Sequence, residues 1–311
     1  MKIIAETASN HMGDFNYLKK LTELAFKHGA DFVTFQMFKL EEFLTKSYGN
    51  YDLFKNLEIN KKSWQNFLEF CIKNGYNIIP CPLDYSSYEI CKEYNLSNIK
   101  IHACDTLNFD FVNYVSNNSK KVFLEVGGVE KHEIINAVDE LDSKKINLIY
   151  GYNNAPKIEN QNIRKVRILN ELFNIPVGFA DHTQDLSTMP ILALCQGSEF
   201  YEKHISIDKN DNSRLDSAVS INVKDLKVIK EKIKIYSKML SMDSLNLNAN
   251  EYNYRNKLFK RLVYNTNHSK DDIISDENIA FKRTNDETFT NLYKKMIIGK
   301  KLIKDVKKDS I

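Results

Sequence analysis

Short apolar runs alternate with longer amphipathic runs through residues 1–240, and this alternation constrains the fold more than any other feature. Each of eight strand-like runs is followed by apolar residues at helical spacing, as in Asp14–His28, which ends at Gly29. Strands that alternate with helices form parallel sheets, and eight such units in about 240 residues predict an α/β fold, a (β/α)8 TIM barrel. The expected strands are Lys2–Glu6, Phe32–Phe35, Tyr76–Pro80, Asn98–His102, Lys121–Val126, Ile146–Gly151, Pro176–Ala180 and Glu199–Ile205.

A doubly wound open sheet has the same alternation and is the alternative. That fold binds dinucleotides at a glycine-rich turn after a strand, and no GxGxxG motif follows any expected strand. The barrel is therefore favoured, without a dinucleotide site.

The composition changes after residue 240. Residues 241–256 are polar and rich in Asn, which predicts a linker. Residues 257–311 contain the β-like runs Arg261–Tyr264, Asn278–Phe281 and Met296–Ile303 between turn-like stretches. A segment of this size buries little core, so we expect a small β-rich accessory domain.

Composition and charge exclude several classes of protein. Lys and Arg total 44 against 41 Asp and Glu, and a net charge of +3 argues against a nucleic-acid binder. No apolar run reaches the roughly 20 residues of a membrane span, and the N-terminus lacks a signal-peptide core. The five cysteines include no CxxC pair. We expect a cytoplasmic protein with reduced thiols and no membrane partner.

Polar residues gather where the expected strands end. Catalytic groups of (β/α)8 barrels lie at the C-terminal ends of the strands. Glu6 in this ring could act as a base or electrostatic group, or simply cap the following turn. The ring includes Glu6, Asn10, Gln36, Cys81, Lys100, His102, Cys104, Asp105, Glu125, Asn153, Asp181, His182, Glu202 and His204.

His182 and His204 end two strands that are adjacent along the chain. Neighbouring strands lie about 4.8 Å apart, so the two imidazoles could share one divalent metal. Imidazole suits Mn, Fe, Co or Zn. A histidine considered alone is more often structural, but the pair at this face predicts a metal site. His102 and Cys104 either add ligands or pack in the core.

Five motifs in matching order resemble the sialic acid (N-acetylneuraminate) synthases. IIAETASNHMGDFNYLKKLTELAFKHGADFVTFQMFK resembles the opening of that family, with its NHxG and FQ elements. VGFADHT resembles IGxSDHT, YEKHI resembles EKHF, and RLDSAVS resembles GPDHxxS. SKDDIISDENIAFKR resembles KKGExISxxNLxxKRP of the antifreeze-like SAF domain.

This resemblance implies a barrel at residues 1–240, a linker at 241–256 and an SAF domain at 257–311. Members of the family are usually domain-swapped homodimers. They condense phosphoenolpyruvate with an N-acyl sugar such as N-acetylmannosamine and use a divalent metal. We expect Mn²⁺ here, or Mg²⁺, Co²⁺ or Zn²⁺, with a small-molecule sugar as substrate.

The resemblance also assigns roles to individual residues. His182 and His204 match the metal ligands, and Glu6 matches a glutamate near the metal-bound water or the substrate carbonyl. Asp216 matches the residue that holds sugar hydroxyls, and Arg283 an SAF-domain arginine that reaches the partner's site. We predict catalytic roles for Glu6, Glu125 and Cys81, and substrate binding by Asn10, Gln36, Lys100, Asp105, Asn153, Asp181, Glu202, Asp216 and Arg283.

Several positions depart from the family pattern where phosphoenolpyruvate binds. Thr34 replaces a lysine, Glu125 replaces a serine, and Cys81 replaces a threonine; Ala103, Asp105 and Ala180 are further departures. Losing a cation and hydroxyl donors while gaining a carboxylate disfavours a phosphate that carries −1.5 to −2 charge. The alternatives are therefore a metal-dependent lyase, aldolase or epimerase, a synthase with a non-phosphorylated donor, and a non-catalytic sugar-binding homologue.

Overall fold

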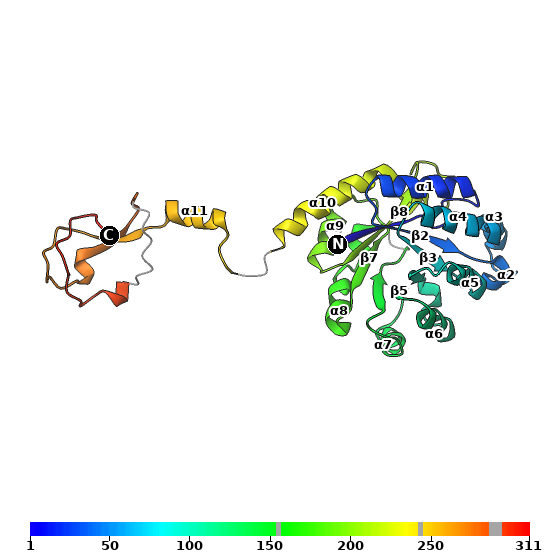
Figure 1. Cartoon of the computed structure of the whole chain (residues 1–311), viewed down its shortest axis with the longest axis horizontal. Coiled ribbons are helices and arrows are strands. Elements are labelled where there is room, and N and C mark those ends of the chain that lie inside the picture. Colours follow the sequence, from blue (N-terminus) through cyan, green and yellow to red (C-terminus); the bar gives the residue numbers. More distant parts are fainter. Residues whose placement is uncertain (154–156, 242–244, 286–293) are drawn as a thin grey trace. The chain divides into compact units, whose positions relative to one another are not determined.

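The computed structural model describes residues 1–153, 157–241, 245–285 and 294–311. The chain divides into two compact units, Met1–Met242 and Asp243–Ile311 (Figure 1). The first unit carries the predicted alternation of strands and helices, and the second carries the short β-like runs.

Eight parallel strands of the first unit form a nearly closed barrel, which confirms the predicted fold class for this unit. Hydrogen bonding follows the order β3-β2-β1-β8-β7-β6-β5-β4, and β3 and β4 pack against each other where the series ends. The strands are β1 (Lys2–Glu6), β2 (Phe32–Met37), β3 (Ile78–Pro82), β4 (Asn98–Ile101), β5 (Lys121–Glu125), β6 (Ile146–Tyr150), β7 (Val177–Asp181) and β8 (Phe200–Ser206).

Helices surround the barrel and follow the strands as predicted (Figure 1). Local capping explains where several begin; Asp14, for example, accepts hydrogen bonds from the backbone N–H groups of Asn16 and Tyr17 at the start of α1. Two short helices after β2, α2 and α3, are additional to the prediction. The helices are α1 (Phe15–Lys27), α2 (Leu40–Phe43), α3 (Tyr51–Leu57), α4 (Lys61–Lys73), α5 (Tyr85–Glu93), α6 (Phe109–Asn118), α7 (Lys131–Asp139), α8 (Arg164–Phe173), α9 (Thr188–Cys195) and α10 (Leu226–Met239).

Successive side chains along each strand point alternately into the barrel and toward the surrounding helices, which gives two separate apolar clusters. Ile4, Phe123 and Phe200 belong to one buried apolar cluster, in which the Phe123 and Phe200 rings meet edge to face. Residues of the opposite parity, such as Ile3 and Tyr201, belong to the larger core shared with the helices. Side chains two positions further along the strand share the inward face. The apolar interior layer therefore lies directly below Glu6, Glu125 and Glu202.

The second unit is small and only partly strand-like. Its strands β10 (Arg261–Tyr264) and β11 (Ile279–Lys282) pair antiparallel, and isolated bridges join His268 to Val306 and Ile273 to Lys301. Two of the three predicted β-like runs are thus confirmed. The prediction of a strand at Met296–Ile303 is wrong: the chain turns there, and only Lys301 makes a bridge. The buried core contains Ile274, Ile279, Leu302 and Val306.

Helix α11 (Ala249–Leu258) occupies the second half of the segment expected as a linker. Asn248 and Glu251 form a capping box at its start, because each side chain accepts a hydrogen bond from the backbone of the other residue. The Asn-rich composition that suggested a linker thus includes the residue that begins a helix.

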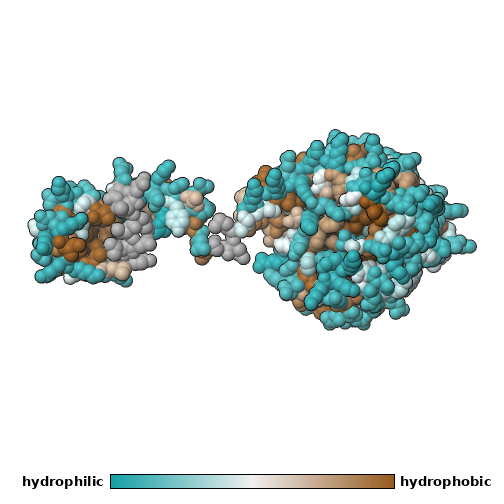
Figure 2. Space-filling model, viewed as in Figure 1, coloured by the Kyte–Doolittle hydropathy of each residue, from teal (hydrophilic) through white to brown (hydrophobic). Residues whose placement is uncertain are grey.

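The surface of the first unit is mainly polar (Figure 2), as expected for a chain in which 27% of the residues are charged. Figure 2 shows a largely hydrophilic surface over the barrel, with hydrophobic residues scattered in this view. Within the described residues, no helix combines the length and the apolar character needed to cross a membrane.

Candidate active site

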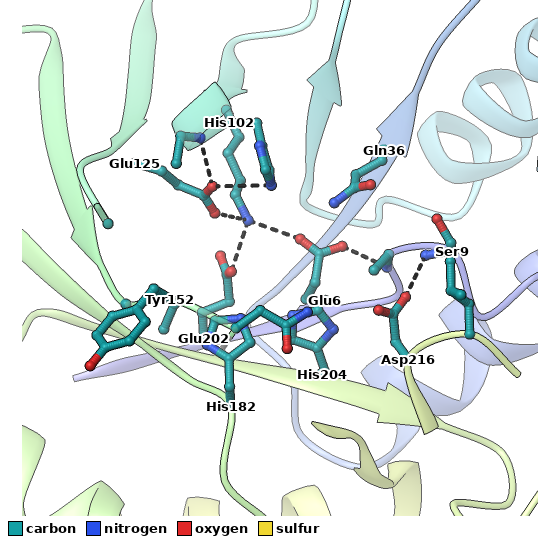
Figure 3. Close-up of a pocket in the computed structure, with 18 of the residues that line it drawn as sticks. Glu6, Ser9, Gln36, His102, Glu125, Tyr152, His182, Glu202, His204 and Asp216 are labelled. Carbon is teal, nitrogen blue, oxygen red and sulfur yellow. Dashed lines mark hydrogen bonds and ion pairs between the residues drawn. The ribbon is translucent and has the colours of Figure 1, made fainter. Parts of the chain in front are cut away.

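A cavity of about 470 Å³ lies among the C-terminal ends of the barrel strands (Figure 3). Seven strands or the residues directly after them contribute to its wall, and the α3 region covers one side. The cavity brings together these predicted site residues: Glu6, Gln36, Lys100, Glu125, Asn153, His182, Glu202, His204 and Asp216.

Lys100 is the centre of a buried charge cluster. Its Nζ lies 2.9 Å from Glu6 Oε2, 2.7 Å from Glu125 Oε1 and 2.8 Å from Glu202 Oε1. The side chains of Lys100, Glu6 and Glu202 are at most 3% exposed, whereas that of Glu125 is 12% exposed. Lys100 therefore pairs with three carboxyl groups, and Glu125 is the most exposed of the three.

Burial and neighbouring charges separate the pKa values of these groups. Burial alone would raise the pKa of Glu125, but the charges of Lys100 and His102 and two hydrogen bonds hold it at about 2. Burial raises the pKa of Glu202 to about 8, helped by Glu6 and Glu125 and opposed by Lys100. Burial disfavours the charge on Lys100, yet the three carboxylates raise its pKa well above the usual range. Burial thus favours the protonated form of Glu202, whereas pairing with Lys100 favours the ionised form of Glu125.

His182 and His204 lie side by side on the wall of the cavity. Their ring centroids are 4.9 Å apart, because β7 and β8 are hydrogen-bonded neighbours. Each residue is 7% exposed. Burial lowers the pKa of His182 to about 4, and burial together with His182 lowers that of His204 far below its usual value. Both imidazoles are therefore neutral at neutral pH.

The histidine pair fits a divalent cation as two of its ligands. Neutral imidazole is the metal-binding form, and each ring also has a buried Nδ1 without a hydrogen-bond partner. In the described part of the chain, however, no three His, Cys, Asp or Glu side chains converge as a metal site. The protein itself thus offers two imidazole ligands at this position.

Asp216 lines the cavity and is held there by the loop after β1. Its Oδ2 accepts a hydrogen bond from the Ser9 backbone N–H at 3.0 Å, and its own N–H donates to Asn10 Oδ1 at 3.0 Å. Burial raises the pKa of Asp216 to about 6. Asn10 Nδ2 donates to Ile205 O and to Ser220 Oγ. Asn10 was predicted to bind substrate. It instead holds Asp216 and the loop after β1 in place, and it does not line the cavity.

Asp181 is the second predicted substrate ligand that lies outside the cavity. It follows the helix-facing parity of β7, and its carboxylate pairs with Lys203 Nζ at 2.6 Å in a fully buried contact. Tyr201 also donates a hydrogen bond to Asp181. The Asp181–Lys203 ion pair links the ends of β7 and β8 on the side that faces the helices. His182 and His204 are the next residues along these strands and face the cavity.

Three further predicted residues are also absent from the cavity lining. Cys81 is fully buried in a cluster with Phe38 and Leu83, and burial raises the pKa of its thiol well above its usual value. Asp105 accepts a hydrogen bond from Asn108 in the turn after β4. Arg283 belongs to the second unit, where its Nε donates to Leu258 O at 3.2 Å.

The cavity also contains residues outside the predicted catalytic, substrate-binding and metal-binding sets, among them His102, for which the sequence left open an added ligand or core packing. Tyr48, Phe54 and Tyr152 line it, and His102 Nε2 lies 3.7 Å from Glu125 Oε2. Tyr152 and His102 directly follow strands, so their position relative to the strand ends was an available signal. Tyr48 and Phe54 come from the α3 region, which no motif marked.

Comparisons with known proteins agree with this architecture. The model of the NeuB family matches residues 21–244. An uncharacterized protein of Methanocaldococcus jannaschii is 31% identical, over 99% of this chain and 92% of that protein. The N,N'-diacetyllegionaminic acid synthase of Campylobacter jejuni is 27% identical, over 99% of this chain and 98% of that protein.

A solved structure has a similar fold. The N-acetylneuraminic acid (sialic acid) synthetase of Leptospira borgpetersenii, in complex with citrate, superposes with a TM-score of 0.76. It is 27% identical and covers 82% of this chain and 91% of its own.

Proposed function

The chain belongs to the NeuB family, and from this premise we propose that it is an enzyme that joins a three-carbon donor to an N-acyl sugar in nonulosonate or surface-polysaccharide biosynthesis. A synthase-like enzyme is supported by relatives such as the legionaminic acid synthase of Campylobacter jejuni. The observation that carries the proposal is the pair of neutral imidazoles, His182 and His204, in a cavity that also contains Glu6 and Asp216.

His182 and His204 would hold a divalent metal, with Mn²⁺ the first expectation and Mg²⁺, Co²⁺ or Zn²⁺ the others. When bound, such a metal supplies Lewis-acid polarisation of the sugar carbonyl. Burial on the wall of the cavity keeps both rings unprotonated and therefore able to bind.

Acidic and amide side chains would hold and orient the sugar. Asp216 is ionised above a pKa of about 6 and can accept hydrogen bonds from hydroxyl groups. Gln36 and Asn153 each add an amide to the wall of the cavity. Glu6 Oε1 accepts the Ala8 N–H at 2.6 Å, which fixes its carboxylate at the end of β1 as an electrostatic or acid–base group beside the reacting carbonyl.

We further propose that residues 257–311 are an SAF domain, which in a domain-swapped homodimer brings Arg283 to the partner's cavity. Arg283 is exposed within its own unit and can contact an N-acyl oxygen. Coexpression of Arg283→Ala with His204→Ala chains tests this, because only a mixed dimer pairs an intact histidine site with an intact arginine. Swapping predicts recovery of about a quarter of wild-type activity. No recovery, or a monomer by light scattering, contradicts it.

A second candidate reaction is a lyase, aldolase or epimerase reaction on a related sugar. The observation that favours it is the engagement of Lys100 with three carboxylates, because a phosphorylated donor needs accessible cations. The non-catalytic alternative has no comparable support, since both imidazoles are present and face the same cavity.

Incubation with labelled donors separates these reactions. The purified chain, Mn²⁺ and N-acetylmannosamine or a diacetamido sugar are mixed with ¹³C-labelled pyruvate or phosphoenolpyruvate. The proposal predicts that label from one donor enters a longer keto acid, with loss of the reaction after chelation. Sugar conversion without any donor would instead establish a lyase or epimerase reaction on the sugar itself. No conversion together with no metal binding would favour the non-catalytic alternative.

A further inference from the structure

We propose that Glu125 is an internal occupant of an anion-binding pocket and that it selects a donor without a phosphate group. This inference rests on the proposed function, because it specifies the donor at the same site. It assigns a specificity role to a residue of this chain whose contacts resemble those of a bound ligand.

Two donors, Lys100 Nζ and the Ala103 N–H, hold the Glu125 carboxylate, and the His102 ring lies beside it (Figure 3). Lys100 Nζ lies 2.7 Å from Oε1, the Ala103 backbone N–H donates to Oε2 at 3.0 Å, and His102 Nε2 lies 3.7 Å from Oε2. A lysine, a backbone N–H and an imidazole together are a donor set that proteins use for carboxylate and phosphate ligands. Here a side chain from the neighbouring strand β5 fills that set.

The lysine has no donor left for a ligand. An ammonium group carries three N–H bonds, and Lys100 Nζ has three carboxylate oxygens within 2.9 Å. Lys100 and the three carboxyl groups all line the cavity, but the Glu125 side chain is 12% exposed, whereas those of Lys100, Glu6 and Glu202 are at most 3% exposed. Glu125 is therefore the partner of the cation that an entering molecule meets most readily.

A phosphorylated donor meets two obstacles at this position. Its phosphate would lie beside a carboxylate that already holds the donors, and like charges that approach without a bridging cation repel. Its oxygens would also have to displace Glu125 from Lys100, Ala103 and His102. A donor without phosphate avoids both obstacles, because it does not need this pocket.

Substituting Glu125 should therefore open the pocket. Glu125→Ser removes the carboxylate and frees a lysine N–H, the Ala103 N–H and space. Glu125→Gln is the matched control, because it removes the charge but keeps a side chain of the same size and an oxygen for Lys100. Comparison of the two variants shows whether Glu125 excludes an anion by filling the pocket or only by its negative charge.

The test is calorimetric titration of the full-length wild type, Glu125→Ser and Glu125→Gln with phosphoenolpyruvate and, separately, inorganic phosphate. We expect no saturable binding to the wild type up to about 10 mM, and at least roughly tenfold tighter binding to Glu125→Ser than to Glu125→Gln. Tight binding to the wild type, or equal gains in both variants, would overturn the inference. If Glu125→Ser does not fold, Glu125→Ala in the same titration serves in its place.

Sugar and metal are absent from these titrations, so their outcome is independent of the proposed function. If the condensation assay fails while Glu125→Ser gains anion binding, the pocket assignment stands and the reaction assignment falls. If the condensation assay succeeds with wild-type protein and phosphoenolpyruvate, the proposed function stands and this inference falls.

Discussion

Replacing Lys100 by methionine removes the cation that contacts three carboxyl groups of the cavity wall. Lys100 Nζ lies 2.7–2.9 Å from oxygens of Glu6, Glu125 and Glu202. Removing one partner of a buried ion pair costs about 3–5 kcal/mol, because the other charge stays buried without compensation. With three acceptors left behind, we expect a loss of at least about 3 kcal/mol of unfolding free energy at neutral pH. A domain of this size then melts roughly 6–20 °C lower.

The loss depends on pH in a defined direction. In the wild type, the pKa of Glu125 is lowered from 4.5 to about 2, so Glu125 stabilises the fold above about pH 4.5 and this contribution is lost as the pH falls toward 2. Without Lys100, burial raises the pKa values of the carboxyl groups above those of the unfolded chain. The folded variant then binds more protons than the unfolded one, and its stability falls as the pH rises. The deficit should be larger at pH 8 than at pH 5.

Urea unfolding followed by Trp64 fluorescence measures this effect in the barrel. Trp64 is the single tryptophan of the chain and is 2% exposed. The matched control is Lys230→Met. Lys230 pairs with Asp31 at 2.6 Å, but both side chains are at least 30% exposed, so this pair contributes about 0–1 kcal/mol. A Lys100→Met deficit no larger than that of the control, or one that is equal at pH 5 and pH 8, would refute the reasoning.

Four other substitutions have defined outcomes. His204→Ala should abolish Mn²⁺ binding in calorimetric titration while the circular dichroism spectrum is retained; unchanged binding would disprove the ligand assignment. Asp216→Asn should raise the KM for sugar more than it lowers kcat, in steady-state kinetics; an unchanged KM counts against a sugar-binding role. Lys203→Met should lower stability by about 3–5 kcal/mol, because Asp181 stays buried; a loss below 1 kcal/mol in urea melts contradicts this. Tyr88→Phe removes hydrogen bonds to Val115 O and Ser119 Oγ and should cost about 1 kcal/mol; an unchanged melting temperature would refute it.

Local sequence patterns predicted the barrel well, because each strand and each helix is determined largely by the residues within it. Apolar runs, helical spacing and stop signals place the strands within two residues of their ends, for example Asn98–Ile101 against the predicted Asn98–His102. The prediction of a strand at Met296–Ile303 was wrong, because the local pattern there does not determine the structure. Met296, Ile298 and Ile303 are exposed in a stretch of turns and only Leu302 is buried, so local β propensity did not decide the structure.

Strand ends also predicted part of the site. Glu6 ends β1, His182 directly follows β7 and His204 lies two residues before the end of β8, and all three have the inward parity that reaches the cavity. Asp181 was assigned to the site as a polar residue at a strand end, yet a one-residue shift along a strand reverses the face. The parity of β7 thus explains why Asp181 lies behind the histidine.

Other features of the site depend on contacts between distant segments. The convergence of Glu6, Glu125 and Glu202 on Lys100 requires the arrangement of four strands around the barrel, which no local pattern contains. Tyr48 reaches the cavity from the α3 region, whose path is set by tertiary packing. Long-range geometry therefore decides which strand-end residues share one cavity.

The most direct test of the account is transfer of donor carbon to the sugar. The wild-type chain is incubated with Mn²⁺, N-acetylmannosamine and each ¹³C-labelled three-carbon donor, and the products are followed by ¹³C NMR. We expect a new carbon–carbon bond between a non-phosphorylated donor and the sugar, formed only when metal is present. Sugar conversion without donor carbon, or incorporation that persists after complete chelation of metal, would contradict it.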